Sequence, residues 1–215
     1  MKNIVYRRAR VNNKPEKMRI LMPQPFILIL ASESPRRKTL LNDLGLRLKI
    51  VPAEVPEIPG PHEDPLWFSK RLAERKAEVV SARYPGRWVL GADTLVALEG
   101  TLFGKPRQAC EAAAFLQALS GKTHRVITSF CLRNDWKQFS YTRSVTTRVT
   151  FKKLSPQEIA WYVRTGEPLD KAGAYAIQGK GAFCVKTIRG SYTNVVGLPV
   201  TEVLAALMKY TGFQL

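Results

Sequence analysis

Cysteine and histidine are scarce in this chain of 215 residues, which holds three cysteines and two histidines. The cysteines Cys110, Cys131 and Cys184 stand far apart, and neither histidine has a partner at metal-ligand spacing. This number and spacing argue against a disulfide framework and against a zinc cluster. We expect all three cysteines to be buried as small hydrophobic residues.

Long apolar runs are missing as well. No apolar run is longer than that of residues 26–31, which is far too short to cross a bilayer. Basic residues and prolines lead the chain without a long apolar segment, so its beginning does not resemble a signal peptide. We therefore predict a cytoplasmic protein that makes no use of a membrane. Apolar residues form 45% of the chain, which is enough for a folded core.

Acidic residues are few: 17 of them face 34 lysines and arginines, and the net charge is +17. Such a balance favours anionic partners, among them nucleic acid, anionic lipid and phosphorylated small molecules. Residues 1–24 hold seven basic residues and one acidic residue, and we predict a basic flexible extension there, in which Met18 and Met22 are alternative starts. The remaining charge is spread along one domain, residues 25–215, without a recognised nucleic-acid-binding motif, so we do not expect nucleic acid to be the main partner.

Strand and helix patterns alternate along that domain. Apolar runs and alternation predict strands at residues 26–31, 46–51, 88–92, 95–98, 101–103, 124–133, 139–152 and 183–188. Capping and apolar spacing predict helices that begin at Pro35, Pro65, Arg107, Pro156 and Pro199. This order of elements predicts an α/β fold, with one elongated mixed sheet that has helices on both sides.

The first candidate site follows the first predicted strand. Ser32 precedes Ser34, which we expect to cap the helix that begins at Pro35, and Arg36 and Arg37 come next. Backbone N–H groups at a helix N-terminus bind anions, and the planar fork of arginine matches phosphate oxygens. The segment predicts a phosphate site, although the same pattern also fits an ordinary helix cap with solvated arginines.

Two carboxylates are candidates for metal binding or for activation of water. Asp93 follows the predicted strand 88–92 and precedes Thr94, and open α/β sheets place functional groups at the carboxyl ends of strands. Glu57 lies in a proline-rich acidic loop and would supply a second oxygen ligand. The alternatives are a turn aspartate that bonds its own backbone and a solvated loop glutamate.

Three lysines and a glycine-rich loop complete the candidate groups. Lys76, Lys105 and Lys171 would offset the charge that develops on phosphate oxygens as a P–O bond breaks. In the loop 170–179, glycines permit close approach of backbone to a ligand, and Gln178 offers a donor and an acceptor to a base edge. Each lysine could also be a solvated surface residue, and the loop could be a structural turn.

Taken in this order, these features resemble the Maf family of nucleoside triphosphate pyrophosphatases. The resemblance covers about residues 26–212. It is carried by residues 30–37 (LASESPRR), 91–94 (GADT), 104–106 (GKP), 166–175 (GEPLDKAGAY), 177–179 (IQG), 190–192 (GSY) and 194–199 (NVVGLP). The chain departs from the family pattern at Glu33, where a small residue is usual, at Ala176, where glycine is common, and in residues 1–24.

The resemblance implies the fold of inosine triphosphate pyrophosphatases, in which an elongated mixed sheet carries a cleft between two lobes. It also implies Mg²⁺ or Mn²⁺ as cofactor, attack by water at the α-phosphorus, and a homodimer. Asp93 matches the proton acceptor of the family. Arg36, Thr94 and Gln178 match its substrate-selecting positions, with residue types that accompany dTTP and UTP; a sister branch acts on 7-methyl-GTP.

The mechanism that we expect combines these groups in one site. Glu57 and Asp93 hold one divalent ion, and Asp93 accepts the proton of the attacking water. Ser34, Arg36 and Arg37 grip the leaving pyrophosphate, and Lys76 and Lys105 balance its charge. Ser32 and Lys171 are further substrate-binding residues. The sequence leaves open which carboxylate binds metal and which takes the proton. Within the enzyme class, the alternative is the same fold acting on modified nucleotides. A septum-inhibiting or nucleic-acid-binding regulator is the alternative from another functional class.

Overall fold

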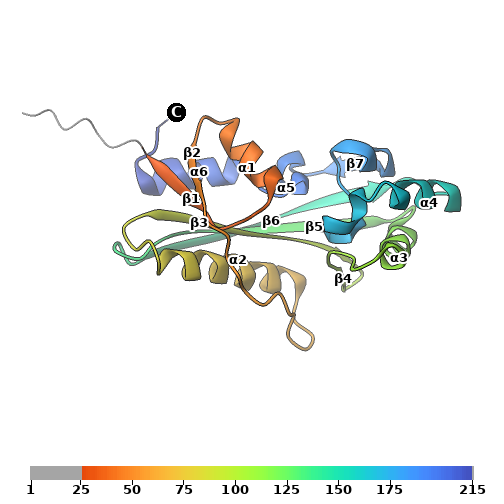
Figure 1. Cartoon of the computed structure of the whole chain (residues 1–215), viewed down its shortest axis with the longest axis horizontal. Helices are drawn as coiled ribbons and strands as arrows, with labels where there is room; N and C mark the ends of the chain where they lie inside the picture. Colours follow the sequence, from red (N-terminus) through yellow and green to blue (C-terminus); the bar gives the residue numbers. More distant parts are fainter. Residues whose placement is uncertain (1–25, 215) are drawn as a thin grey trace, which may run out of the picture.

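Three long antiparallel strands run along the molecule and form the spine of a mixed sheet (Figure 1). The computed structural model describes residues 26–214. The spine consists of β3 (Trp88–Leu98), β5 (Thr123–Asn134) and β6 (Phe139–Phe151). Four shorter strands complete the sheet: β1 (Ile27–Leu30), β2 (Arg47–Ile50), β4 (Thr101–Phe103) and β7 (Val185–Arg189). The strand order is β2-β1-β3-β5-β6-β7, and β4 pairs with β3.

The parallel part of the sheet holds the first half of the site. Strand β1 (Ile27–Leu30) pairs in parallel with β2 (Arg47–Ile50) on one side and with β3 on the other. Helix α1 (Pro35–Asn42) begins as predicted: Ser34 caps it, and Pro35, which has no N–H to leave unpaired, occupies the first turn. The turn between β1 and α1 therefore places backbone N–H groups at one end of β1.

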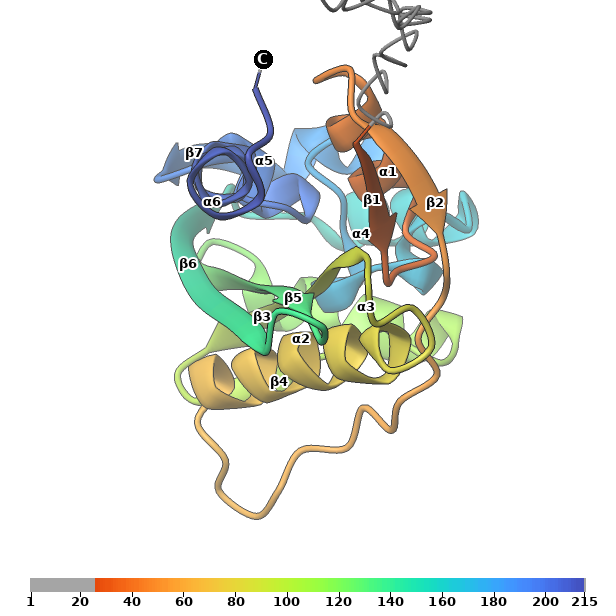
Figure 2. The same ribbon diagram turned by 90° about the vertical axis from the view of Figure 1, so that its left-hand side faces the viewer.

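Helices cover both faces of this half (Figure 2). The apolar side of α2 (Pro65–Ser81) packs on one face, with Ala73, Ala77 and Val80 fully buried. Helices α1 and α6 (Val200–Thr211) cover the other face. Gly91 permits the close approach of α2, because a Cβ atom there would lie 2.4 Å from the carbonyl oxygen of Ala73.

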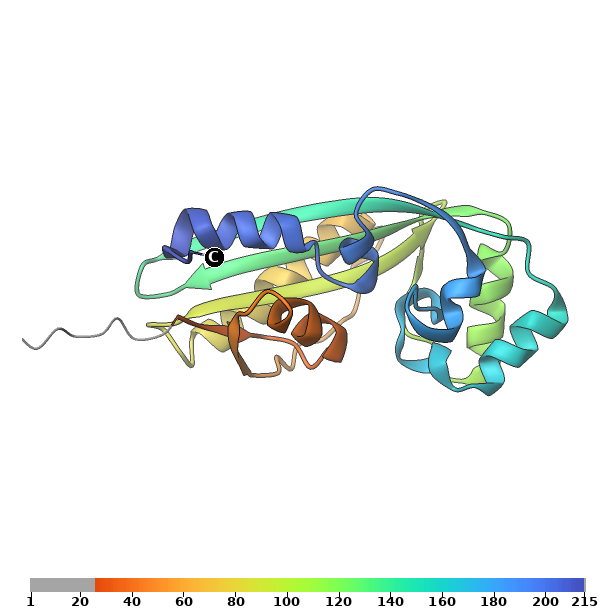
Figure 3. The same ribbon diagram turned by 90° about the horizontal axis from the view of Figure 1, so that it is seen from above.

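The second lobe gathers at the far end of the long strands (Figure 3). Helix α3 (Ala109–Leu119) and helix α4 (Pro156–Arg164) pack there around a core that includes Phe151 and Tyr162. The chain then forms three 3₁₀ helices, η1 (Glu167–Asp170), η2 (Ala172–Ala174) and η3 (Gly179–Cys184). It returns through β7 (Val185–Arg189) and α5 (Tyr192–Val196) to the first lobe.

The predicted α/β fold with an elongated mixed sheet is confirmed, and so is the capping box at Ser155 and Glu158. The hairpin at Glu99 and Gly100 is confirmed too, since β4 (Thr101–Phe103) pairs with the end of β3. The predicted extension, residues 1–24, lies outside the described residues. Among residues 26–214, no helix combines the length and apolar character that crossing a bilayer requires.

Three predictions differ from the structure. The segments 88–92 and 95–98 form one strand rather than two, because β5 pairs with β3 without a break from Val89 to Ala97. The segment predicted as a glycine-rich loop is folded into 3₁₀ turns. Helix α5, which follows β7, was not among the predicted helices. Cys110 is exposed on α3, whereas Cys131 and Cys184 are buried, and all three are free thiols.

Candidate active site

A pocket of about 440 Å³ opens where β1 ends beside β3, between the first lobe and the 3₁₀ turns of the second. Its size falls in the range of small-molecule sites. Every side chain that the sequence singled out lines this pocket: Ser32, Ser34, Arg36, Arg37, Glu57, Lys76, Asp93, Thr94, Lys105, Lys171 and Gln178. Residues that are far apart in the sequence therefore share one cavity.

Asp93 lies in the middle of β3, not at the end of a strand as predicted. The strand continues because β5 remains paired with it, whereas β1 leaves the sheet earlier. The last backbone hydrogen bond between the two segments runs from the Ala31 N–H to the Leu90 carbonyl oxygen and is 2.9 Å long. Between that point and Val96, where β4 pairs with β3, no described strand pairs with β3 on this side, and Asp93 lines the pocket in this gap.

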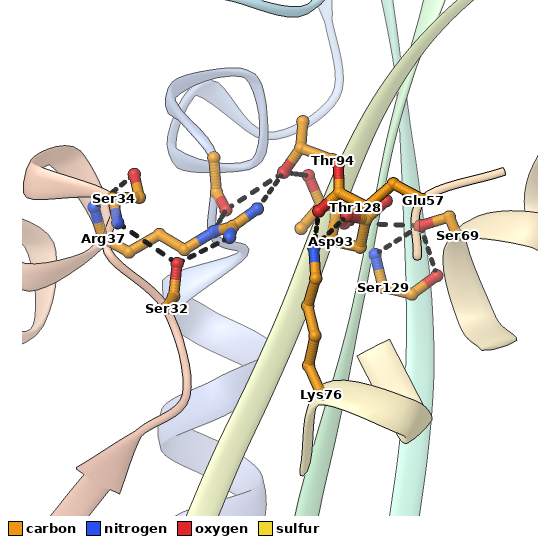
Figure 4. Close-up of polar contacts among 11 residues, drawn as sticks. Ser32, Ser34, Arg37, Glu57, Ser69, Lys76, Asp93, Thr94, Thr128 and Ser129 are labelled. Carbon is orange, nitrogen blue, oxygen red and sulfur yellow. Dashed lines mark hydrogen bonds and ion pairs between the residues drawn. The ribbon is translucent and has the colours of Figure 1, made fainter. Parts of the chain in front are cut away.

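Lys76 joins the two carboxylates (Figure 4). Its ammonium nitrogen lies 2.7 Å from Asp93 Oδ1 and 2.5 Å from Glu57 Oε1. Asp93 is 5% exposed, and its other oxygen, Oδ2, is buried and has no hydrogen-bond partner among residues 26–214. A buried carboxylate oxygen that lacks a donor is costly, so this atom has capacity for a proton, a cation or a water molecule.

Electrostatics favour the charged form of Glu57. Burial raises the pKa of Glu57, but the hydrogen bond from Lys76 and the charges of Lys76, Lys105 and Arg37 lower it. The net effect is a pKa below the ordinary value. Glu57 is therefore an anion at neutral pH, beside the buried Asp93.

Arg37 is buried and contacts three neutral oxygens instead of an acid (Figure 4). Its guanidinium donates to Gly197 O at 2.8 Å, to Ser32 Oγ at 2.9 Å and to Thr94 Oγ1 at 2.9 Å. Burial lowers the pKa of Arg37, and the nearby Asp93 carboxylate acts in the opposite direction. The contacts tie α1, β3 and the end of α5 together at the floor of the pocket.

The second lobe brings Lys105, Lys171 and Gln178 to the mouth of the pocket, and Arg36 reaches it from α1 in the first lobe. Arg36 lies 3.6 Å from Asp170, and Lys171 donates to the carbonyl oxygen of Glu167 at 2.9 Å and to Asp170. The N–H of Gly173 donates to Gly104 O at 3.0 Å, which joins η2 to the segment that carries Lys105. Cations from both lobes thus surround the entrance.

Sequence reasoning missed two groups at the floor. The carbonyl oxygen of Gly197 accepts from Arg37 and from Thr94, the latter at 3.2 Å, and Thr128 Oγ1 lies 3.0 Å from Thr94 Oγ1. The segment 194–199 carries the family resemblance, but only the folded return of α5 to β3 could show that a backbone oxygen acts there. The sequence placed Asp170 in the glycine-rich loop but did not predict its ion pair with Arg36.

The oxygen donors suit a hard divalent cation. Among residues 26–214, no three His, Cys, Asp or Glu side chains form a group that could hold a metal alone. Mg²⁺ in nucleotide enzymes takes one or two carboxylates and completes its ligands with substrate phosphates and water. The unpartnered Asp93 Oδ2 and the ionised Glu57 match that need.

Comparison with known proteins identifies the family. The family model described as Maf-like protein matches residues 27–210. The chain is 52% identical over 181 residues to a Myxococcus xanthus protein named dTTP/UTP pyrophosphatase, and the match covers 84% of the chain and 91% of the relative. A protein of the same name from Citrifermentans bemidjiense is 47% identical over 84% of the chain and 93% of its own length.

Solved structures give weaker matches. Protein VC0702 from Vibrio cholerae matches with a TM-score of 0.43 and 11% identity, over 89% of the chain and 100% of that protein. The Staphylococcus aureus Ham1 protein matches with a TM-score of 0.46 and 11% identity, over 85% of the chain and 98% of that protein. The match to the family model spans nearly all of the described residues, and the chain belongs to the Maf-like protein family.

Proposed function

We propose that this chain is a nucleoside triphosphate pyrophosphatase that hydrolyses dTTP and UTP to the monophosphate and pyrophosphate. The names of its relatives support this activity and this substrate class. The observation that carries the proposal is the Asp93 carboxylate: one oxygen is held by Lys76, and the other is buried without a partner inside a pocket lined by cations.

Asp93 supplies the base in this reaction. A water molecule attacks the α-phosphorus, its proton passes to Asp93 Oδ2, and the bond from the α-phosphorus to the bridging oxygen breaks, so that pyrophosphate leaves. Lys76 holds Oδ1 at 2.7 Å and so fixes the direction of the free oxygen. A general base in the right place contributes about 10²- to 10⁴-fold to a rate.

The cations around the pocket bind the triphosphate. The capped start of α1 offers backbone N–H groups, and Arg36, Lys105 and Lys171 lie at the mouth, where they meet charged oxygens. Arg37 acts from the floor, since its guanidinium already donates to three neutral oxygens. Thr94 and Gln178 select the pyrimidine base.

A divalent cation, Mg²⁺ or Mn²⁺, belongs to this site. Glu57 and Asp93 would hold it, and when bound it would neutralise charge on the phosphate oxygens. Because both carboxylates also contact Lys76, the lysine keeps them together in the absence of substrate.

A nucleotide panel with the variant Asp93→Asn tests the function. We expect pyrophosphate release from UTP and dTTP in the presence of Mg²⁺ or Mn²⁺, and a loss of about 10²- to 10⁴-fold in kcat for Asp93→Asn. Asp135→Asn, in the turn between β5 and β6, is the matched control and should retain activity. Wild-type turnover by Asp93→Asn would refute the role of Asp93, and a preference for 7-methyl-GTP would refute the pyrimidine selectivity.

Three further properties belong to the proposal, and of these the homodimer rests on the family resemblance. Residues 25–215 form the nucleotide pyrophosphatase domain, the protein works in the cytoplasm, and it forms a homodimer. Light scattering tests the last of these, since a particle of one chain mass, 24.2 kDa, would contradict the homodimer.

A further inference from the structure

Gln178 sits in a segment that is held on both sides by one pair of side chains. The residue is exposed at the mouth of the pocket, between η2 and the start of η3. Neither 3₁₀ helix has a side-chain cap. What fixes the position of Gln178 must therefore come from elsewhere in the second lobe.

Glu167 provides the contacts on one side. Its Oε2 accepts from the N–H of Lys180 at 3.1 Å, and its Oε1 accepts from the N–H of Gly181 at 2.9 Å. These two N–H groups lie in the first turn of η3, which begins at the residue after Gln178. Hydrogen bonds to an ionised carboxylate are stronger than those between neutral groups, so Glu167 is well suited to hold this turn.

Tyr162 provides the contact on the other side. Its hydroxyl donates to Glu167 Oε1 at 2.9 Å and accepts from the N–H of Ala176 at 3.3 Å. Tyr162 lies on α4 and is fully buried, so it connects the segment to the core of the lobe. We call Tyr162 and Glu167, with these four hydrogen bonds, the loop clamp.

Two glycines make room for the loop clamp. A Cβ atom at Gly181 would lie 2.3 Å from the Tyr162 hydroxyl, and one at Gly179 would lie 3.0 Å from Glu167 Oε2. Gly179 also has a φ of +76°, which side chains with a Cβ rarely adopt. The backbone around Gln178 is thus shaped to fit against Tyr162 and Glu167.

We propose that Glu167 is a positioning residue for base selection, and that it acts with Tyr162 by fixing Gln178 in the pocket. The proposal rests on the proposed hydrolysis of dTTP and UTP. Uracil and thymine present an acceptor at position 4, whereas cytosine presents a donor there. A glutamine amide carries both a donor and an acceptor, so it tells these bases apart only when its position is restrained.

The variant Glu167→Gln tests the proposal. Its amide nitrogen cannot accept a hydrogen bond, so one of the N–H groups of Lys180 and Gly181 loses its acceptor. We expect the ratio of kcat/KM for UTP to that for CTP to fall roughly tenfold, less than the about 10²-fold that a misplacement of 1 Å can cost, because three of the four hydrogen bonds remain. Tyr162→Phe should lower the same ratio. It provides the test if Glu167→Gln does not fold.

Glu158→Gln is the matched control. Glu158 lies in the same lobe and also accepts from backbone, at the capping box of α4, but its hydrogen bonds come from Ser155 and Lys152 and not from the segment around Gln178. Loss of stability alone would affect both variants and would leave the UTP to CTP ratio unchanged. An unchanged ratio in folded Glu167→Gln and Tyr162→Phe would overturn the proposal.

Two further measurements separate this proposal from the proposed function. In the double variant Glu167→Gln with Gln178→Ala, the UTP to CTP ratio should equal that of Gln178→Ala alone. If the two substitutions instead lowered the ratio independently, so that their effects multiplied, Glu167 would not act through Gln178. Hydrogen exchange at Ala176, Lys180 and Gly181 should be faster in Glu167→Gln than in Glu158→Gln. That measurement requires no turnover, so equal rates would refute the loop clamp even if the wild-type chain hydrolysed no nucleotide.

Discussion

The two walls of the pocket are held by different kinds of contact. On the first wall, formed by α1, α2 and β3, charged side chains meet below the surface, with Lys76 against Asp93 and Arg37 against neutral oxygens. On the second wall, formed by η1, η2 and η3, backbone N–H groups donate to the loop clamp. Beneath them, the Tyr175 hydroxyl lies 2.8 Å from His124 Nε2.

In the proposed function, this difference separates chemistry from recognition. A strand buried on both faces holds a carboxylate in one place, which the attack of water on phosphorus requires. Turns held by a few hydrogen bonds can differ in sequence without disturbing the sheet, which suits the selection of a base. Variants on the first wall should therefore change turnover and global stability, and variants on the second should change selectivity.

The largest effect is expected from Lys76→Met on the first wall. Lys76 is the cation closest to Asp93, and both side chains are at most 10% exposed. Its removal leaves a buried carboxylate without its ion pair, so we expect the free energy of unfolding to fall by about 3–5 kcal/mol, together with a loss of turnover. Urea denaturation measures this, with the exposed Arg75→Met as control; equal stability of the two variants would contradict the account.

A pH-dependent effect of similar size is expected under the second wall. Burial lowers the pKa of His124 from its ordinary value of 6.5 to about 4. Between these values the unfolded chain binds a proton that the folded chain does not bind. The free energy of unfolding should therefore be largest above pH 6.5 and should fall by up to about 3 kcal/mol as the pH drops toward 4.

The variant His124→Gln should flatten this pH dependence, whereas His62→Gln, at an exposed position, should leave it as in the wild type. Denaturation at about pH 7 and about pH 5 measures the difference. A His124→Gln chain that loses stability on acidification as steeply as the wild type would show that other groups are responsible.

A smaller effect is expected from Gly91→Ala, which tests how closely the first wall is packed. The new Cβ would lie 2.4 Å from Ala73 O and 2.6 Å from Ala77 N, both in the backbone of α2. Overpacking of this kind costs roughly 1–3 kcal/mol. Gly104→Ala is the control, because no atom lies within 4 Å of its added Cβ; equal melting temperatures would argue against tight packing of α2 on β3.

The smallest effect is expected from Asp170→Asn, which breaks the ion pair that spans the two walls. The Asp170 side chain is 67% exposed and lies 3.6 Å from Arg36. Solvent screens such a pair, so the free energy of unfolding should change by less than about 1 kcal/mol. The loss of one negative charge at the mouth should lower KM for UTP modestly, and a large drop in stability would show that the walls depend on this contact.

The local parts of this structure could be predicted from the sequence. Ser34 with Pro35 gives a helix start, Glu99 with Gly100 gives a hairpin, and Ser155 with Glu158 gives a capping box. Each depends on a few neighbouring residues. A single position such as Glu57 fitted either a metal ligand or a solvated loop residue. The family resemblance favoured the functional interpretation of these positions.

The rest depends on contacts between distant segments. The single strand that carries Asp93 follows from its pairing with β5, and a local pattern cannot show that pairing. The role of the Gly197 carbonyl follows from the return of α5 to the first lobe. The loop clamp brings Glu167 against Lys180 and Gly181, which no spacing in the sequence indicates.

Isotope labelling tests the central claim most directly, because it shows which phosphorus the water attacks beside Asp93. The wild-type chain would be incubated with UTP and a divalent cation in water that carries a heavy oxygen isotope. The account predicts that the label appears in UMP and not in pyrophosphate. Label in pyrophosphate, or release of inorganic phosphate instead of pyrophosphate, would contradict it.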